Sequence, residues 1–363
     1  MPKHNAQNTR IKREYFEYLK EAMRRDDTSI DAVAKALARF EAANSYKDFR
    51  KFRREQAMAF KRKLDSDRNA KTGKPLARAT VHSTLSALKA FFIWLAGQPG
   101  YKSKIAYADA EYFNLSAKDV RIAKATRTKP FPSLEQVHRV LDLMPAETDI
   151  EKRNRGLIAF AILTGARDGA IASFQLRHVN LVEGVVHQDA RDVKTKASKT
   201  FSTWFLPVGG NALAIFTDWC QHLRVNLHWS ETDPLFPKTH IGIGPNGGFA
   251  AIGISRESWS NSGPIRTIFR EAFGAAGLPY FNPHSFRDTL VQLGEQACPT
   301  VEAFKAWSLN IGHKGMLTTL TSYGNMSAQR QASLIRDMGK PVGSDPLLDP
   351  DIRALIERIQ KKA

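Results

Sequence analysis

Three short segments in the second half of the chain carry side chains suited to chemistry on a phosphate group. They read LTGARDGAIASFQLRHV (163–179), NPHSFRDTL (282–290) and NIGHKGMLTTLTSYG (310–324). Their candidate functional residues are, in chain order, Arg167, His284, Arg287, His313 and Tyr323. Guanidinium groups pair with two phosphate oxygens at once, histidines move protons near neutral pH, and a tyrosine hydroxyl can act as a nucleophile. These residue types together favour covalent chemistry on a phosphodiester.

Each type has a definable task in such a reaction. In-line attack builds negative charge on the equatorial phosphate oxygens, and Arg167 and Arg287 suit the stabilisation of that charge. A tyrosine phenol has an ordinary pKa of about 10, so only about one molecule in 10³ is ionised at pH 7. Tyr323 therefore needs a proton acceptor, for which His284 is suited, while His313 can donate a hydrogen bond to a phosphate oxygen.

The order of these residues is more informative than any single spacing, because a His-x-x-Arg pattern arises readily by chance. An arginine in a Thr-Gly-Ala-Arg turn comes first, the His-x-x-Arg follows, and Gly312-His313 precedes the tyrosine by ten residues. In this ordered set the chain resembles the tyrosine recombinase (phage integrase) family, over both domains expected below. The resemblance implies six catalytic residues around one DNA phosphate: Arg167, Lys196, His284, Arg287, His313 and Tyr323.

The resemblance also implies a function and partners. It implies a site-specific recombinase that cleaves and rejoins double-stranded DNA through a 3′-phosphotyrosine intermediate. The expected partners are double-stranded DNA and further copies of the chain in a homotetramer on DNA, with an accessory DNA-bending protein as a candidate. Neither a metal nor another cofactor is expected, because the phosphotyrosine bond conserves the energy of the broken ester.

The candidates for the catalytic lysine lie in one segment. The sequence VKTKASK (193–199) offers Lys194, Lys196 and Lys199 within an expected hairpin, from which a lysine can protonate the departing 5′ oxygen. We assign this role to Lys196, which stands just before the expected turn, and keep Lys194 as the second choice.

The chain departs from the family pattern at two points. Ala170 stands where the family usually has an acidic residue, and Asp168 or Asp288 could support Arg167 in its place. The spacing from His313 to Tyr323 is one residue longer than in the commonest members, which favours a subfamily variant over an inactive protein. Taken singly, each residue also has a structural interpretation, such as a helix cap or a surface aromatic, and the ordered set outweighs it.

Charge points to the same partner. The chain has 54 Lys and Arg against 36 Asp and Glu, a formal net charge of +18. Residues 1–128 hold 28 basic and 14 acidic residues, so this third alone contributes +14. Such a field favours a polyanion, and nucleic acid first, although ribosomal and other basic proteins share the balance. The N-terminal third is expected to be the main electrostatic contact with DNA.

Periodicity predicts that residues 1–123 form a helical domain, and the family resemblance together with its basic charge implies that this domain binds DNA. Apolar residues recur at helical spacing over 28–40, behind a capping-box pattern from Thr28 to Asp31, and again over 80–96. Between them, 45–64 has one apolar stripe and one basic face, which indicates a helix that packs on one side. The candidate DNA-binding side chains on that face are Arg50, Arg53, Arg54, Lys61 and Arg62. A merely solvated basic face is an equally good interpretation.

The basic, proline-containing segment 124–132 reads as a linker. A mixed α/β catalytic domain, mostly α with a small antiparallel sheet, is expected over 133–340, opening with a capping box from Ser133 to Gln136. Short β-branched runs at 185–190 and 200–208 predict a hairpin. The glycine-rich segment 242–254 lacks the features of a phosphate-binding loop and is expected to be a flexible loop.

The tail, 341–363, is expected to carry a short helix over 351–361 whose apolar face docks either on its own domain or on a neighbouring copy. The whole fold is therefore expected to be mainly α. Cys220 and Cys298 fit neither a disulfide framework nor a zinc site. No apolar run reaches the ~20 residues of a membrane span and no secretory leader is visible, so a cytoplasmic protein without membrane contact is expected. Two other functions stay open, a type IB topoisomerase and a catalytically silent DNA-binding regulator of the same fold.

Overall fold

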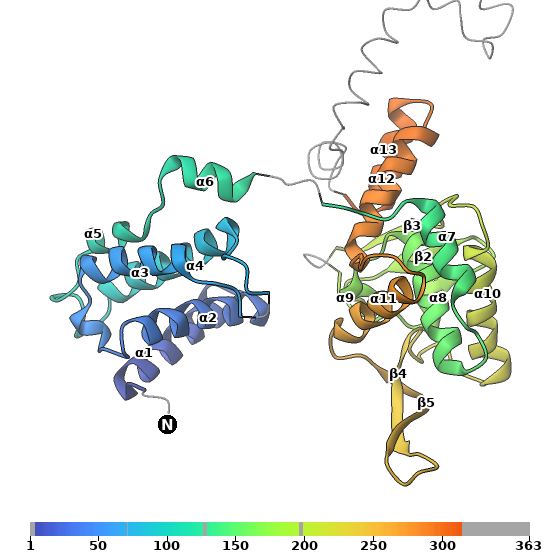
Figure 1. The fold of residues 1–363 in the computed structure, drawn as a ribbon, viewed down its shortest axis with the longest axis horizontal. Coiled ribbons are helices and arrows are strands. Elements are labelled where there is room, and N and C mark those ends of the chain that lie inside the picture. Colours follow the sequence, from blue (N-terminus) through green and yellow to red (C-terminus); the bar gives the residue numbers. More distant parts are fainter. Residues whose placement is uncertain (1–3, 71, 126–128, 196–198, 314–363) are drawn as a thin grey trace, which may run out of the picture. The chain divides into compact units, whose positions relative to one another are not determined.

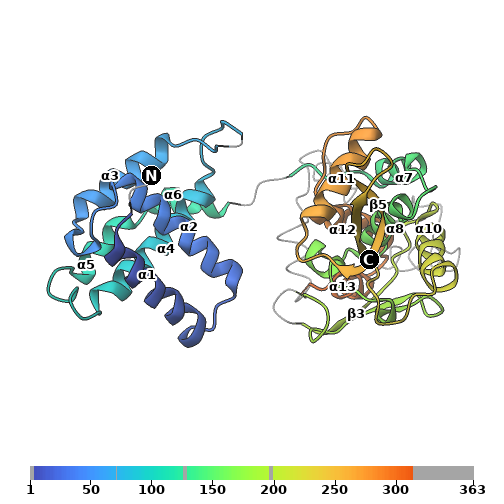
Figure 2. The same ribbon diagram turned by 90° about the horizontal axis from the view of Figure 1, so that it is seen from below.

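The computed structural model describes residues 4–70, 72–125, 129–195 and 199–313. The chain divides into two compact units, residues 1–127 and 128–363 (Figures 1 and 2). Lys196, Tyr323 and the tail expected at 341–363 lie outside the described residues.

The first unit is helical. Its helices are α1 (Ala6–Glu17), α2 (Asp27–Ala43), α3 (Arg54–Ser66), α4 (Arg78–Ala96), α5 (Tyr107–Ala110) and α6 (Ala117–Lys124), joined in part by a π-helical turn at Tyr18–Ala22 and 3₁₀ turns at Phe49–Lys51 and Glu111–Phe113. Its core is aromatic: the Phe52 and Phe92 rings stack with centroids 3.9 Å apart, and Phe40 meets Phe92 edge-on at 5.4 Å.

Helix α4 is the central core helix of this unit. By length and composition alone it is long and apolar enough to cross a membrane. Eight of its residues are buried against the rest of the unit, among them Leu88, Phe91 and Leu95 with no exposed surface. Packing in the core accounts for its hydropathy.

Two expectations for this unit are corrected. Asp26 and not Thr28 caps α2, because the Asp26 carboxylate accepts a hydrogen bond from the Ser29 amide at 2.7 Å. The expected helix over 45–64 is interrupted, since Phe52 and Arg53 have extended backbones between the 3₁₀ turn and α3. The Gln56 side chain accepts a hydrogen bond from the Arg53 amide at 2.8 Å and thereby fixes the start of α3.

The second unit surrounds a small sheet with helices. The helices are α7 (Leu134–Leu143), α8 (Asp149–Thr164), α9 (Asp168–Ile171), α10 (Ala212–Gln221), α11 (Gly263–Ala275), α12 (Phe286–Ala297) and α13 (Val301–Asn310), with 3₁₀ turns at Leu176–His178 and Pro283–Ser285 and a π turn at His222–Asn226. Strands β1 (Val179–Asn180), β2 (Val185–Gln188) and β3 (Phe201–Trp204) form an antiparallel sheet in that order. The mainly α fold with a small antiparallel sheet is confirmed.

Helix α8 is the buried centre of this unit. Every residue from Gly156 to Thr164 is buried. A β-carbon at Gly156 would lie 2.8 Å from the Trp219 side chain, so glycine is what lets α10 pack this closely. Thr148 and Glu151 form the capping box that starts the helix.

The expected capping box at Ser133 is present, with reciprocal side-chain hydrogen bonds between Ser133 and Gln136. The hairpin expected from 185–190 and 200–208 is confirmed as β2 and β3, with Val186 opposite Thr203. The expectation of a flexible loop over 242–254 is wrong. This segment lies in a second hairpin, β4 (Pro237–Ile243) and β5 (Phe249–Ser258), whose turn contains Gly247 at φ +75. Glycine in the left-handed region permits the tight turn between two apolar strands.

Candidate active site

The first and second motif segments meet at the end of α8. Gly165 ends this helix in the left-handed conformation (φ 60, ψ 21), and Arg167 is the N-cap residue of α9. The Arg287 side chain is 2% exposed, and its Nη1 donates a hydrogen bond to the Gly165 carbonyl oxygen at 2.7 Å. Arg287 is thereby held by the same turn that presents Arg167.

His284 is presented by the 3₁₀ turn that leads into α12. Pro283 starts this turn, and both the amide and the hydroxyl of Ser285 donate hydrogen bonds to the Asn282 carbonyl, at 2.9 and 2.7 Å. His284 is exposed, while Arg287, one helical turn further on, is buried. The His-x-x-Arg spacing therefore places a histidine at the surface above a buried guanidinium.

The third segment is fixed by the sheet. The Thr203 hydroxyl of β3 donates to the Asn310 carbonyl at 2.9 Å, and the Asn310 side chain exchanges two 2.8 Å hydrogen bonds with the Trp204 backbone. Gly312 follows with φ +74, and the His313 amide donates to the Ser308 carbonyl at 3.1 Å. The strand that comes after the lysine-bearing segment is thus tied to the turn that carries His313.

The charges of Arg167 and Arg287 act on both His284 and His313. Partial desolvation of the otherwise exposed His284 ring lowers its pKa to about 4, and burial lowers the pKa of His313 to about 3. For both rings the next causes are the positive charges of Arg287 and then Arg167. Both histidines are therefore neutral at pH 7, each with one ring nitrogen able to donate a hydrogen bond and one able to accept a proton.

The lysine segment is only partly described. Lys194 is directed elsewhere, since its Nζ lies 3.4 Å from the Ser260 carbonyl and its amide donates to the Ser173 hydroxyl at 2.9 Å. The charge of Lys199 is among those that lower the pKa of His313, so this residue lies within electrostatic range of that ring. Of the two lysines of this segment that are described, Lys199 is the one whose charge lowers the pKa of His313.

Sequence reasoning missed Lys129 and Arg266. The Lys129 charge lowers the pKa of His284 and of Asp288. Arg266 of α11 holds the Asp168 carboxylate through its Nε at 2.9 Å and its Nη2 at 2.7 Å. Neither residue belongs to a motif, and only the packing of distant segments reveals them.

The two carboxylates considered as support for Arg167 have different surroundings. Asp168 forms its ion pair with Arg266 and raises the pKa of His284. Burial raises the pKa of Asp288 to about 6, partly offset by the positive charges of Lys129 and Arg287. Asp168, one of the two candidates for the support of Arg167, is thus already paired with Arg266 at the start of α9.

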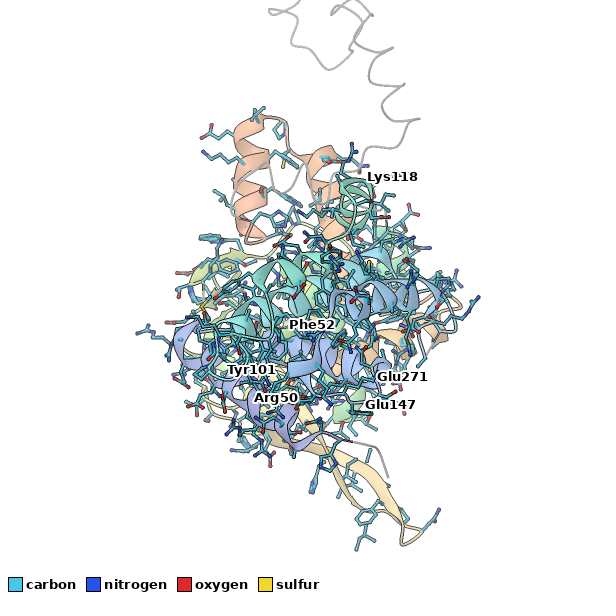
Figure 3. All side chains as sticks on the ribbon, turned by 90° about the vertical axis from the view of Figure 1, so that its left-hand side faces the viewer. Arg50, Phe52, Tyr101, Lys118, Glu147 and Glu271 are labelled. Carbon is cyan, nitrogen blue, oxygen red and sulfur yellow. The ribbon has the colours of Figure 1, made fainter. Side chains whose placement is uncertain are left out.

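The candidate DNA-binding residues of the first unit share the surface of α3 and the turn before it. All but Lys61 are exposed (Arg50 is labelled in Figure 3). The side chain of Arg50 pairs with Asp48, and Arg54 lies over the Tyr112 ring at 5.6 Å. Lys61 Nζ donates to the Asn114 carbonyl at 3.0 Å. Arg53 Nη1 donates to the Phe52 carbonyl at 3.1 Å. Four of the five therefore have intramolecular partners, which orient the cations at the surface.

The amino-acid sequence is similar to that of known tyrosine recombinases over part of its length. No family model matches the chain. Tyrosine recombinase XerC of Escherichia coli O127:H6 (strain E2348/69 / EPEC) is 31% identical over 164 residues, 45% of this chain and 48% of that protein. XerC of E. coli (strain K12 / DH10B) is 30% identical over the same length. The chain spans about half the length of the curated relatives it matches.

Solved structures agree in fold. A lambda integrase(75–356) dimer bound to a COC′ core site has a TM-score of 0.57 at 14% identity, covering 88% of this chain and 97% of that one. The chain is therefore similar to tyrosine recombinases over part of its sequence, and it shares the fold of solved members of that family. XerH site-specific recombinase bound to palindromic difH substrate gives the same TM-score and identity over 91% of this chain and 85% of its own. The tyrosine recombinase resemblance drawn from the motif order is thereby confirmed.

Proposed function

We propose that the protein is a site-specific DNA recombinase that breaks and rejoins DNA strands through a 3′-phosphotyrosine intermediate. The observation that carries this proposal is the cluster of Arg167, Arg287 and two neutral histidines, formed by three segments far apart in sequence. Two arginines beside two uncharged proton carriers match the needs of phosphoryl transfer by a weakly acidic nucleophile.

In this mechanism the Tyr323 oxygen forms a bond to the phosphorus while the bond to the 5′ oxygen breaks. His284 takes the phenolic proton, and His313 donates a hydrogen bond to a phosphate oxygen. Arg167 and Arg287 stabilise the charge on the equatorial oxygens. The reverse attack by a 5′ hydroxyl rejoins the strand, so no external energy source is needed.

A lysine of segment 193–199 gives its proton to the departing 5′ oxygen. Lys196 remains our choice for this role, and Lys199 replaces Lys194 as the second candidate, because its charge reaches His313 whereas Lys194 lies on the Ser260 carbonyl. Lys196→Ala and Lys199→Ala, each tested with a 5′-phosphorothiolate leaving group that needs no protonation, would separate the two. Rescue of only one variant identifies the general acid.

Binding of DNA prepares the histidines for this task. Before DNA binds, burial and two arginines keep both rings neutral. A phosphate anion between the arginines opposes their effect and raises the pKa of His284, which makes that ring a better base when substrate is present.

The partners follow from the same proposal. The first unit, with most of the net charge, is the helical DNA-binding domain (1–123), joined through the linker 124–132 to the catalytic domain (133–340) and the tail. One solved relative is a lambda integrase tetramer bound to a Holliday junction, with a TM-score of 0.52. We extend tetramer assembly on double-stranded DNA to this chain, with an accessory DNA-bending protein as a further partner and the cytoplasm as the location.

The test is covalent trapping. Wild-type protein incubated with a nicked suicide substrate carrying its site should form an adduct that survives denaturation, and Tyr323→Phe should bind the same DNA and form none. Tyr280→Phe is the matched control, because Tyr280 lies 42% exposed in the catalytic unit outside the motif segments. Adducts that persist in Tyr323→Phe would refute the assignment of the nucleophile.

Two outcomes would replace the proposal. Relaxation of a supercoiled plasmid without any recognition site would indicate a type IB topoisomerase. Specific DNA binding by wild-type protein with no adduct on any substrate would indicate a regulator that has kept only the fold.

A further inference from the structure

The β4–β5 hairpin projects from the second unit (Figure 1). The residues near its end are apolar. Ile243 pairs with Phe249 and Ile241 with Ala251, so these four side chains share one face of the ribbon. Within the described residues Phe249 is 89%, Ile243 76% and Ile241 56% exposed. Exposure of an apolar face to water is unfavourable, and contiguous exposed apolar residues are typical of a contact surface.

The chemistry of the tip favours a protein partner over DNA. Between Thr239 and Ile254 the sequence has no Lys, Arg, Asp or Glu. The charges near the root are already paired, Lys238 with Glu257 at 2.7 Å and Arg256 with Asp233 at 3.3 Å. A ribbon that inserts into DNA needs cations beside its wedge to meet the phosphates, and this tip has none.

The same unit has an apolar groove that fits such a tip. It has a volume of about 190 Å³ and lies between α7, α8 and α11. Its apolar lining is formed by Val140, Leu143, Met144, Pro145, Ile268, Ala272 and Ala275. A cavity of about 150 Å³ lined by apolar side chains admits a benzene molecule, so this groove has room for the Phe249 ring.

The charged groups that line the groove are acidic and therefore disfavour contact with DNA. Glu151 and Glu271 line it (Glu271 is labelled in Figure 3), and two carboxylates repel phosphate. The Glu151 carboxylate is held by the amides of Glu147 and Thr148 at 3.0 and 2.9 Å. Leu143 is 57% exposed at the mouth, as expected of an apolar site that is partly open.

A hairpin cannot fill the groove of its own chain. Its root is fixed to α8, where Arg153 Nη1 donates to the Pro237 carbonyl at 2.9 Å and to the Thr239 hydroxyl at 3.0 Å. Asn154, the next residue, lines the groove. The tip, six residues along an extended strand from Pro237, is about 20 Å from this root. The occupant that fits is the tip of another copy.

We propose that the hairpin tip of one copy, formed by Ile241, Ile243 and Phe249, inserts into the α7–α11 groove of a second copy bound to the same DNA. This inference rests on the proposed function, which brings copies together on DNA. The tip offers on the order of 400 Å² of apolar surface, below the roughly 800 Å² per partner of a stable complex. The contact therefore forms only between copies that DNA already holds side by side.

The experiment compares binding to DNA with one site and DNA with two adjacent sites, measured by gel shift and mass photometry. The tip variant is Phe249→Ser, the groove variant is Leu143→Glu, and the control is Val182→Ser, at a 98% exposed apolar residue outside both surfaces. Each test variant should bind a single site within about twofold of wild type and lose at least about tenfold in two-site cooperativity. The control should keep it.

A mixture of the two variants gives the sharpest readout. A groove-defective copy still has its tip and a tip-defective copy still has its groove, so the mixture should regain cooperativity that neither variant shows alone. Unchanged cooperativity in Phe249→Ser, or no recovery in the mixture, would overturn the inference. So would weaker single-site binding by Phe249→Ser, which would place the tip on DNA, or an effect of Leu143→Glu alone, which would mean that another segment, such as 351–361, fills the groove.

Failure of this contact can be distinguished from failure of the proposed function. Wild-type protein that forms the covalent adduct but shows cooperativity insensitive to these variants loses only the contact. Wild-type protein that forms no adduct loses the proposed function itself.

Discussion

Replacement of His313 should change how stability depends on pH. The folded-state pKa of this ring is lowered to about 3, while an unfolded chain has the ordinary value of 6.5. Between these values the unfolded state binds the proton and the folded state does not, so the free energy of unfolding falls as pH falls from 6.5 toward 3. His313→Asn cannot take up this proton and should escape that part of the acid destabilisation.

The magnitude follows from linkage. At pH 5 the unfolded imidazole is almost fully protonated and the folded one almost entirely neutral, whether its pKa is 3 or 4. The free energy of unfolding that depends on His313 should therefore drop by about 2 kcal/mol between pH 7 and pH 5. His313 is 4% exposed, so solvent screening reduces this value little.

Two neighbours also titrate. His284 acts in the same direction, but its exposure reduces the effect. Asp288 acts in the opposite direction, because its folded pKa is raised to about 6 and its protonated form is favoured as pH falls through that value. Both remain in the His313→Asn variant, so the difference between variant and wild type isolates His313.

The assay is urea unfolding at pH 7 and pH 5, followed by tryptophan fluorescence. Five of the six tryptophans lie in the second unit, so the signal reports mainly on the unit that contains the site. Wild type should lose about 2 kcal/mol more between the two pH values than His313→Asn. Equal losses would refute the reasoning, because they would mean that His313 is not held neutral by its surroundings.

Three further outcomes are expected. In thermal melts, Gly312→Ala should lower the free energy of unfolding by at least about 2 kcal/mol, because φ is +74 and the new methyl would lie 2.7 Å from the Phe201 ring. The control Gly73→Ala, where φ is +64 and the space around the new methyl is open, should cost about 1 kcal/mol. Arg62→Gln should reduce the salt slope of DNA binding by about 0.9, and an unchanged slope would remove this residue from the interface. Arg266→Gln should slow adduct formation about tenfold at unchanged DNA affinity, since it frees the start of α9, while the stability change stays within about 1 kcal/mol.

Local patterns determined much of the fold. The helix over 80–96, the capping box at Ser133 and the β2–β3 hairpin were predictable, because amphipathic periodicity, side-chain caps and β-branched runs act over a few residues. The same approach missed the break before α3 and the β4–β5 hairpin. In both cases turn chemistry at a few residues, Phe52-Arg53 and Asn246-Gly247, decided the backbone.

The order of Arg167, His284, Arg287 and His313 was readable from the sequence, and so was the chemistry that they suit. Their meeting was not: the hydrogen bond from Arg287 to Gly165 joins residues 122 positions apart. The depressed histidine pKa values, the pairing of Asp168 with Arg266 and the choice between Lys194 and Lys199 depend on burial and on distances across the fold. The sequence by itself determined which groups are available, and only tertiary packing decided which of them act on one another, because desolvation and Coulomb interactions are set by positions in space.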